Sequence, residues 1–210
     1  MPESREQEQL RRLLSRRAAD AARALIGCVL VRRHRGRTLQ ARIVEAEAYL
    51  GFDDPAAHVY RGPTPRTQPL FGPPGTIYVY FVYGMHHQFN VVTGVANVPH
   101  AVLVRALEPV EGMALMRERR RAVPDRDLTN GPGKLCQALG IDRALDAADL
   151  LGPRVWIERG EGPLPRTAIA RGPRIGIDYA ERWAAMPWRF WIRGNPFVSR
   201  PPARVSGRSG

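Results

Sequence analysis

Alternation of apolar and polar residues is clearest between residues 38 and 49, where it predicts a strand with two different faces. The apolar run 28–33 precedes it and is joined to it by a turn at 35–37, which predicts a hairpin. Six later segments are also expected to be strands: 76–83, 86–93, 101–107, 154–158, 174–177 and 188–193. Of these, 86–93 is the return strand of a second hairpin that begins with 76–83.

Helices are expected to be few and short. Residues 15–26 have an apolar side closed by Gly27, Pro109 can begin a helix that runs to Arg121, and 129–140 is a turn leading into a short helix closed by Gly140. Residues 54–58 resemble a helix start, and 180–185 form a short helix at most. Strands and helices do not alternate regularly, which favours an α+β fold with a mainly antiparallel sheet.

The length of 210 residues favours one domain, which we place at residues 15–200. The charged segment 1–14 is expected to be frayed. The tail 201–210, rich in Pro, Gly and Arg, is expected to be disordered.

Two carboxylates and an aromatic ring share one face of the 38–49 strand, because Glu45, Glu47 and Tyr49 are spaced by two residues. Burying a carboxylate without a partner costs free energy, so these glutamates are expected to have an ion-pair or hydrogen-bond partner or a functional role. The alternative is that both pair with arginines on a solvated face of the sheet. Arg105 lies in the apolar strand 101–107, where a buried arginine needs a carboxylate or phosphate partner.

The formal net charge of +12 is expected to draw the protein to polyanions, with nucleic acid ahead of an anionic membrane. Lys134 is the only lysine. The two cysteines, Cys28 and Cys136, are far apart, so a disulfide framework or a zinc site is not expected and a reducing compartment fits. We expect no signal peptide, no membrane span and no metal site.

Tyrosines are concentrated at the second hairpin. Tyr78 and Tyr80 share one face, and Tyr83, beside Gly84 at the hairpin tip, can act as a wedge. The alternative is an aromatic core layer, which is favoured for Tyr78 and Phe81. One carboxylate, several tyrosines, His58 and a basic surface are the parts that nucleobase excision uses, because the base must be held between aromatic faces while water attacks the sugar.

Five blocks of sequence resemble the alkyladenine (3-methyladenine) DNA glycosylase family, in order, from about residue 20 to residue 199. They are IVEAEAYLG at 43–51, AAH at 56–58, PGTIYVY at 74–80 with YGM at 83–85, RALEP at 105–109 and GPGKLCQAL at 131–139. The resemblance implies a single domain around a curved antiparallel sheet, and we expect the second hairpin to protrude from it. It also implies a monofunctional, metal-free enzyme without a cofactor, which leaves an abasic site in double-stranded DNA containing damaged purines. We expect a cytoplasmic monomer.

The resemblance also implies roles for individual residues. Glu47 matches the carboxylate that activates water, and Arg105 matches an arginine beside that water. The base pocket would be formed by Tyr49, His58, Tyr80 and Asn90, the last disfavouring the guanine 2-amino group. Tyr83 matches the tyrosine that intercalates into DNA, and Met85, His86 and Lys134 are candidate DNA contacts. His86 and His87 depart from the aromatic residues of some relatives, so the resemblance does not fix the lesion range.

Three other interpretations stay open at this point. Lys134 could act as the Schiff-base amine of a bifunctional glycosylase/lyase. Glu45, Glu47, Asp53 and Asp54 could be the oxygen ligands of a metal-dependent nuclease. The chain could also be a non-catalytic module that binds nucleic acid on a stacking platform of tyrosines.

Overall fold

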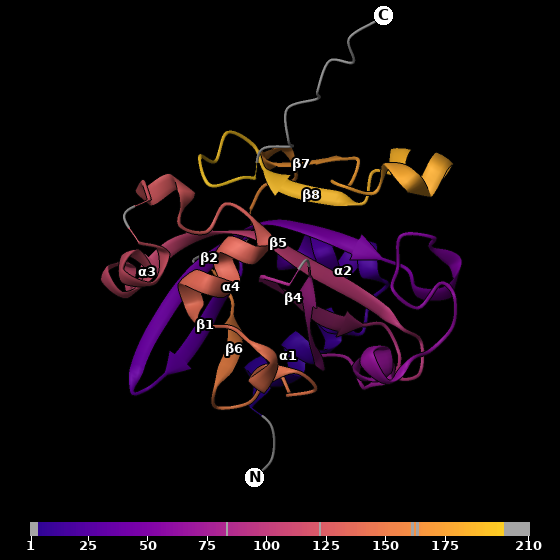
Figure 1. Cartoon of the computed structure of the whole chain (residues 1–210), viewed down its shortest axis with the longest axis horizontal. Helices are drawn as coiled ribbons and strands as arrows, with labels where there is room; N and C mark the ends of the chain where they lie inside the picture. The colour runs from indigo at the N-terminus through magenta and orange to yellow at the C-terminus, as the bar shows by residue number, and fades with distance from the viewer. Residues whose placement is uncertain (1–3, 83, 122, 161, 163, 200–210) are drawn as a thin grey trace, which may run out of the picture.

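One antiparallel sheet organises the protein, as its computed structural model shows (Figure 1). The structure describes residues 4–82, 84–121, 123–160, 162 and 164–199. Within them the strands are β1 (Val29–His34), β2 (Arg37–Tyr49), β3 (Ile77–Val82), β4 (His86–Thr93), β5 (His100–Glu111), β6 (Val155–Glu158), β7 (Ile169–Gly172) and β8 (Arg189–Ile192). The α-helices are α1 (Arg5–Leu14), α2 (Ala18–Leu25), α3 (Met113–Arg120) and α4 (Pro132–Leu139), and short 3₁₀ helices include η1 (Gly51–Asp53), η2 (Pro65–Phe71) and η6 (Asp178–Ala185).

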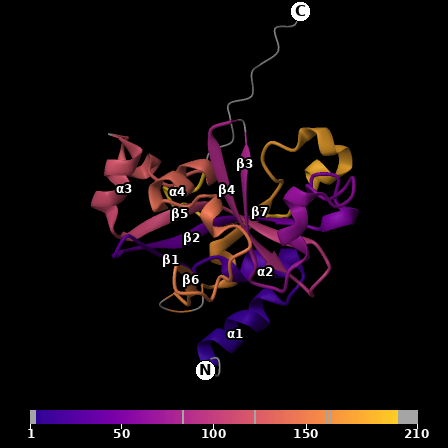
Figure 2. The ribbon, with the colours of Figure 1, turned by 60° about the horizontal axis from the view of Figure 1, so that its bottom comes forward.

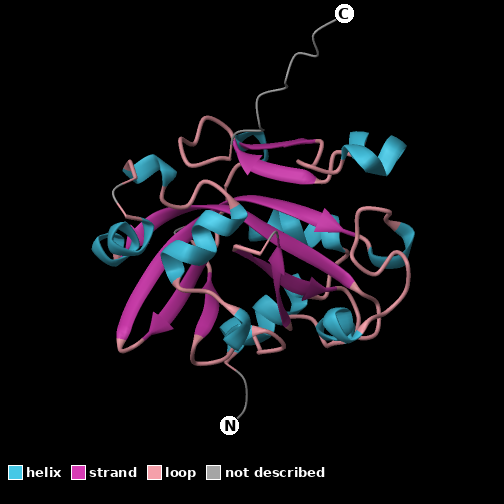
Figure 3. Cartoon of the chain, in the orientation of Figure 1, coloured by secondary structure: helices cyan, strands magenta, loops and turns pink. Residues whose placement is uncertain are grey.

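The strand order β3-β4-β5-β2-β1-β6 places β2 and β5 at the centre of the sheet. β1 pairs with the first half of β2, and β8, itself paired with β7, takes the same edge of β2 from Glu45 to Glu47. The described strand pairs are antiparallel, and Figure 3 shows a curved layer with short helices around it. The β3–β4 hairpin projects from the layer in Figure 2. The expected single-domain α+β fold is therefore confirmed.

The two faces of the central strands have different surroundings. Val79, Phe89, Val91, Val102 and Val104 point into the main core, where α2 packs on β2 and β5 and α4 packs on β4 and β5. The alternate residues of the same strands point to the other face, which carries the polar and tyrosine side chains. The period of two seen in the sequence thus separates a core from a site.

Helix α1 corrects the expectation of a frayed N-terminal segment. Ser4 caps it in a capping box with Gln7, and Leu10, Leu13 and Leu14 are buried in the main core. The charged residues that suggested fraying lie on the opposite side of an amphipathic helix. The 201–210 tail lies outside the described residues.

Two element boundaries also differ from expectation. Pro109 belongs to β5, opposite Ala41 at a register shift, and α3 starts only after Gly112. A proline is tolerated where strand pairing is irregular, because no ladder donor is needed there. Residues 174–177 form a loop, since the strand of this region is β7, and residues 54–58 form turns instead of a helix.

The prediction of an aromatic core layer is correct for Tyr78 and wrong for Phe81. Tyr78 is buried, whereas Phe81 is 41% exposed on the β3–β4 hairpin. Among the described helices, none is both long and apolar enough to span a bilayer.

Candidate active site

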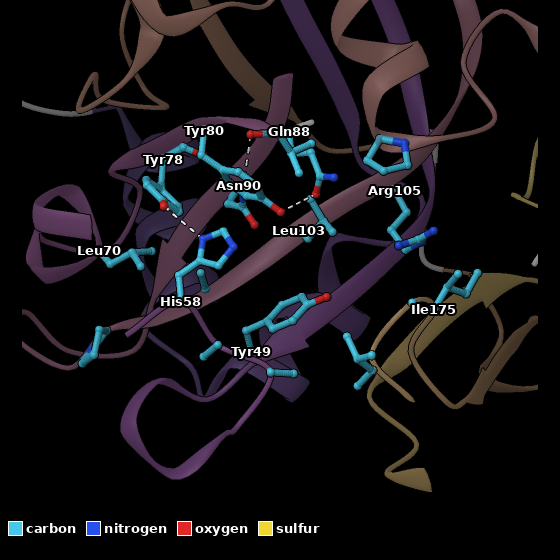
Figure 4. A pocket seen from close by; sticks show the side chains of 18 of the residues that line it. Tyr49, His58, Leu70, Tyr78, Tyr80, Gln88, Asn90, Leu103, Arg105 and Ile175 are labelled. Atoms are coloured by element: carbon cyan, nitrogen blue, oxygen red, sulfur yellow. Dashed lines mark hydrogen bonds between the residues drawn. The ribbon is translucent and has the colours of Figure 1, made fainter. Parts of the chain in front are cut away.

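A cavity of about 340 Å³ opens on the polar face of β2, β3, β4 and β5. Sequence-predicted residues from five separate segments line it: Tyr49, His58, Tyr80, Asn90 and Arg105. Figure 4 shows their side chains around one space, with Ile175 on the opposite side from Tyr78 and Tyr80. The volume lies within the range of small-molecule pockets, about 300–1,000 Å³.

Tyrosine and histidine rings form one wall of the cavity. Tyr78 and Tyr80 are stacked with their ring centroids 5.5 Å apart, and the ring of His58 meets Tyr80 edge-on at 4.2 Å. His58 Nδ1 and the Tyr78 hydroxyl are hydrogen-bonded at 3.0 Å. The hydroxyl of Tyr80 donates to the side-chain carbonyl of Gln88, a lining residue that sequence reasoning missed. The wall therefore combines flat apolar faces with a few fixed polar groups.

The titratable groups of this wall are neutral near pH 7. Desolvation, with a further contribution from Arg66, lowers the pKa of His58 to about 4. Burial raises the pKa of Tyr49 and of Tyr80, and the Glu47 carboxylate raises that of Tyr49 further. Both hydroxyls therefore stay protonated and can donate hydrogen bonds.

Glu47 is completely buried, and its three hydrogen-bond partners all line the cavity. Its Oε2 accepts from the Tyr49 hydroxyl at 3.0 Å and from Arg105 Nη1 at 3.2 Å. Its Oε1 accepts from the backbone N–H of Ile175 at 2.8 Å. The carboxylate thus lies directly behind the cavity wall. Ile175 was not predicted, because a backbone donor leaves no signal in sequence.

Irregular pairing between β2 and β5 accounts for the position of Arg105. Glu45 is opposite Ala106 and Ala46 is opposite Val104, so Arg105 is an extra residue on β5 at this point. Such bulges redirect side chains, and they occur frequently beside active sites. Arg105 Nε lies 3.4 Å from Glu45 Oε1, and its Nη1 reaches Glu47. The expectation that Arg105 has a carboxylate partner is confirmed.

Both glutamates pair with arginines, as the alternative interpretation held, but on a buried face instead of a solvated one. Glu45 also accepts from Arg189 at 3.1 Å and from the backbone N–H of Ser199 at 2.7 Å. Burial opposes the charge of Arg105, but the carboxylates of Glu47 and Glu45 raise the pKa of its guanidinium above the ordinary value. The cluster is therefore a compact group of paired charges.

Asn90 has a defined orientation at the cavity. Its amide nitrogen donates to the backbone carbonyls of Tyr78, at 3.2 Å, and of Gln88, at 3.4 Å. Because the nitrogen is used by the backbone, the side-chain oxygen of Asn90 is the end left for a bound molecule.

The candidate DNA contacts lie next to one another beside the cavity. Met85 is 67% exposed at the tip of the β3–β4 hairpin. His86 packs against the start of α4, where a Cβ on Gly133 would lie only 3.0 Å from the His86 ring. Lys134, on the same turn, donates to Asn130 at 2.7 Å. Tyr83, the predicted intercalating residue, lies outside the described residues.

Three of the four carboxylates needed by the nuclease interpretation are otherwise engaged, whereas Asp53 is exposed. Asp54 forms a buried ion pair with Arg174, while Glu45 and Glu47 pair with Arg105. Within the described ranges, no three His, Cys, Asp or Glu side chains converge as metal ligands would. Lys134 does not line the cavity, although Pro132 of the same turn does.

An aromatic cavity backed by a buried, arginine-paired carboxylate is an arrangement expected of an enzyme that holds a flat ring compound close to a proton acceptor. Comparisons with known proteins identify the family. A family model described as methylpurine-DNA glycosylase (MPG) matches residues 12–196. The chain therefore belongs to the methylpurine-DNA glycosylase family, and it is a DNA glycosylase, a hydrolase of DNA repair that acts on DNA.

Bacterial relatives match over most of the chain, and each is named "Putative 3-methyladenine DNA glycosylase". The relative from Myxococcus xanthus is 48% identical over 192 residues, covering 90% of this chain and 93% of its own. One from Anaeromyxobacter dehalogenans strain 2CP-1 is 50% identical over 182 residues, covering 86% and 80%. One from Alkaliphilus oremlandii is 45% identical over 199 residues, covering 90% and 98%. The predicted family is confirmed.

Proposed function

We propose that this protein is a monofunctional glycosylase for alkylated or deaminated purines. It flips the damaged nucleotide out of double-stranded DNA, holds the base in the cavity and hydrolyses the N-glycosidic bond to leave an abasic site. Glu47 activates the water, and Tyr83 fills the vacated position in the base stack.

The observation that supports this most strongly is the environment of Glu47. A carboxylate offers about four lone-pair positions. Among the described residues, Tyr49, Arg105 and Ile175 use three of them, which leaves one to accept a proton from water. Arg105 both touches Glu47 and lines the cavity, so it can orient the same water molecule.

For an alkylated purine the reaction balances without a further reactant, whereas a neutral deaminated purine also needs a proton on the leaving base. Glu47 takes one proton of the water while the water oxygen bonds to the sugar C1′. The N-glycosidic bond breaks, and its electron pair stays on the base nitrogen. An alkylated purine is cationic before this step and leaves as a neutral base, so it requires no acid from the protein.

The wall of the cavity suits a flat base. Tyr49 and Tyr80 offer ring faces, and a neutral His58 does not repel a cationic purine. Cation–π attraction to tyrosine contributes about 0.5–2 kcal/mol to the binding of such a base.

DNA is bound, in this proposal, across the mouth of the cavity between the β3–β4 hairpin and the start of α4. Met85 and His86 come from the hairpin and Lys134 from the helix, so both sides of the mouth contact the duplex. The wedge position of Tyr83 comes from the sequence alone.

Base release tests the proposal. Duplexes carrying a single 3-methyladenine, hypoxanthine or ethenoadenine are incubated with enzyme in excess and with EDTA, for wild type and Glu47→Gln in parallel. Release by wild type and a loss of about 10²–10⁴-fold in Glu47→Gln is expected. Equal release by both would show that Glu47 is not the general base. Borohydride trapping of abasic DNA tests the lyase alternative, which requires an adduct that Lys134→Ala abolishes.

A further inference from the structure

Arg174 connects the loop after β7 to the strand that carries Glu47. Its side chain is completely buried, and so is that of its partner Asp54. Arg174 Nη1 lies 2.5 Å from Asp54 Oδ2 and Nη2 lies 2.9 Å from Oδ1, which is a two-pronged pair. Nη1 also donates to the backbone carbonyl of Ala48 at 2.9 Å, so the guanidinium is tied directly to β2.

Asp54 is held as firmly as its partner. Its carboxylate accepts from the backbone N–H groups of Leu50 and Ala56, each at 3.1 Å. The segment that follows carries His58 to the cavity wall. Asp54 therefore ties the start of this segment to the loop that contains Arg174, 120 residues later.

The guanidinium of Arg174 also lies over two aromatic rings. Its central carbon is 4.6 Å from the centroid of Tyr49 and 5.0 Å from that of Trp188. Tyr49 is the residue whose hydroxyl donates to Glu47. One arginine consequently fixes a ring of the cavity wall from behind.

The residue after Arg174 completes the connection, because the N–H of Ile175 donates to Glu47 Oε1 at 2.8 Å. Two of the three donors to Glu47, the Tyr49 hydroxyl and the Ile175 amide, are thus held in place by Arg174. A buried ion pair is seldom more stabilising than apolar residues of similar volume, whereas its geometry is strict. We therefore expect this pair to fix the positions of its neighbours more than to stabilise the fold.

We propose that Arg174, oriented by Asp54, is the positioning residue that aligns Glu47 to take a proton from the attacking water. This inference rests on the proposed role of Glu47, and it concerns two residues that lie outside the pattern of the predicted site. Arg174 does not line the cavity and acts only through Tyr49 and Ile175.

The test uses the full chain, with Arg174→Lys, which keeps the charge but loses the two-pronged geometry, and Asp54→Asn, which keeps the size. Single-turnover release is measured from pH 5 to pH 9 and normalised to the folded fraction. Both variants are expected to lose about tenfold to a hundredfold in rate, the scale of a small misplacement at a reacting centre. Their affinity for lesion DNA should stay within about twofold, because neither residue meets DNA.

The pH profile separates positioning from a merely structural effect. Among the described residues, the charged groups around Glu47 are Arg105 of β5, Glu45 of its own strand, Arg189 of β8 through Glu45, and Arg174 behind Tyr49. None of these charges changes in Arg174→Lys. A carboxylate that loses a donor is more easily protonated, so the acidic limb of the rate profile of Arg174→Lys should move to higher pH.

Arg32→Lys is the matched control. Arg32 is likewise buried and binds backbone carbonyls, at Arg33, Arg154 and Gly140, but it lies away from the cavity. The Arg32→Lys variant should have a lower melting temperature than wild type but the same pH profile of the rate. A folded Arg174→Lys with the wild-type rate and profile would overturn the inference. Activity that persists in Glu47→Gln would instead overturn the proposed function on which it rests.

Discussion

Replacing Arg105 by methionine should expose the electrostatic cost of burying Glu47. The side chain of Arg105 is 10% exposed and those of Glu45 and Glu47 are fully buried. After the replacement, Glu45 keeps Arg189 at 3.1 Å, but Glu47 retains, among the described residues, only the neutral donors Tyr49 and Ile175. Glu47 is then a buried charge without a cation, while methionine conserves much of the volume.

Breaking a buried pair in this way costs about 3–5 kcal/mol. A protein of this size loses about 2–4 °C of melting temperature per kcal/mol, so Arg105→Met should melt about 6–20 °C lower at pH 7.5. Burial without a cation disfavours the charged form of a carboxylate. The difference from wild type should therefore shrink as the pH falls towards 5.

The assay is thermal and urea unfolding of wild type, Arg105→Met, Glu47→Gln and the double variant. Removing the charge of Glu47 should recover most of the loss, which the double-mutant cycle measures. The partly exposed pair of Arg42 and Glu108, 3.5 Å apart, provides the control: Arg42→Met should cost less than about 1 kcal/mol. A melting temperature within about 2 °C of wild type, or no recovery in the double variant, would refute the reasoning.

Two further predictions concern DNA and pH. Tyr83→Ala should weaken lesion-specific binding by about 1–3 kcal/mol, the scale of a lost stacking contact. Non-specific binding should weaken less, because phosphate contacts dominate it. Titrations with lesion and undamaged duplexes measure both affinities, and equal losses would contradict the wedge assignment. His58, with its pKa lowered from 6.5 to about 4, binds fewer protons in the folded state than in the unfolded chain, so it should reduce stability as the pH falls through that range. Melting curves should therefore depend less on pH in His58→Phe, and an unchanged dependence would argue against a neutral His58.

The sequence predicted those parts of the molecule that depend on local pattern. Alternation located β2 and placed Glu45, Glu47 and Tyr49 on one face, and the apolar setting of Arg105 predicted its carboxylate partners. The role of each of these residues stays a prediction.

The errors arose where distant segments decide the structure. Residues 54–58 looked like a helix start, because nothing nearby indicates that the partner of Asp54 is Arg174. Pro109 looked like a helix start, since the register shift that accommodates it in β5 depends on pairing with β2. The amide of Ile175 reaches Glu47 only through the folded loop, and a backbone donor has no sequence signature.

Two tyrosines of the cavity each have an arginine guanidinium on one face of the ring. Arg174 lies over Tyr49 and Arg66 lies 5.3 Å from the centroid of Tyr80. A ring whose electrons are attracted by one cation has less attraction left for a second, and the charge of each guanidinium repels a cationic base. A cationic base therefore gains less from these two rings than from tyrosines with no cation nearby. In the proposed reaction, the advantage of an alkylated purine would then lie more in how easily its bond breaks than in how tightly the base is held.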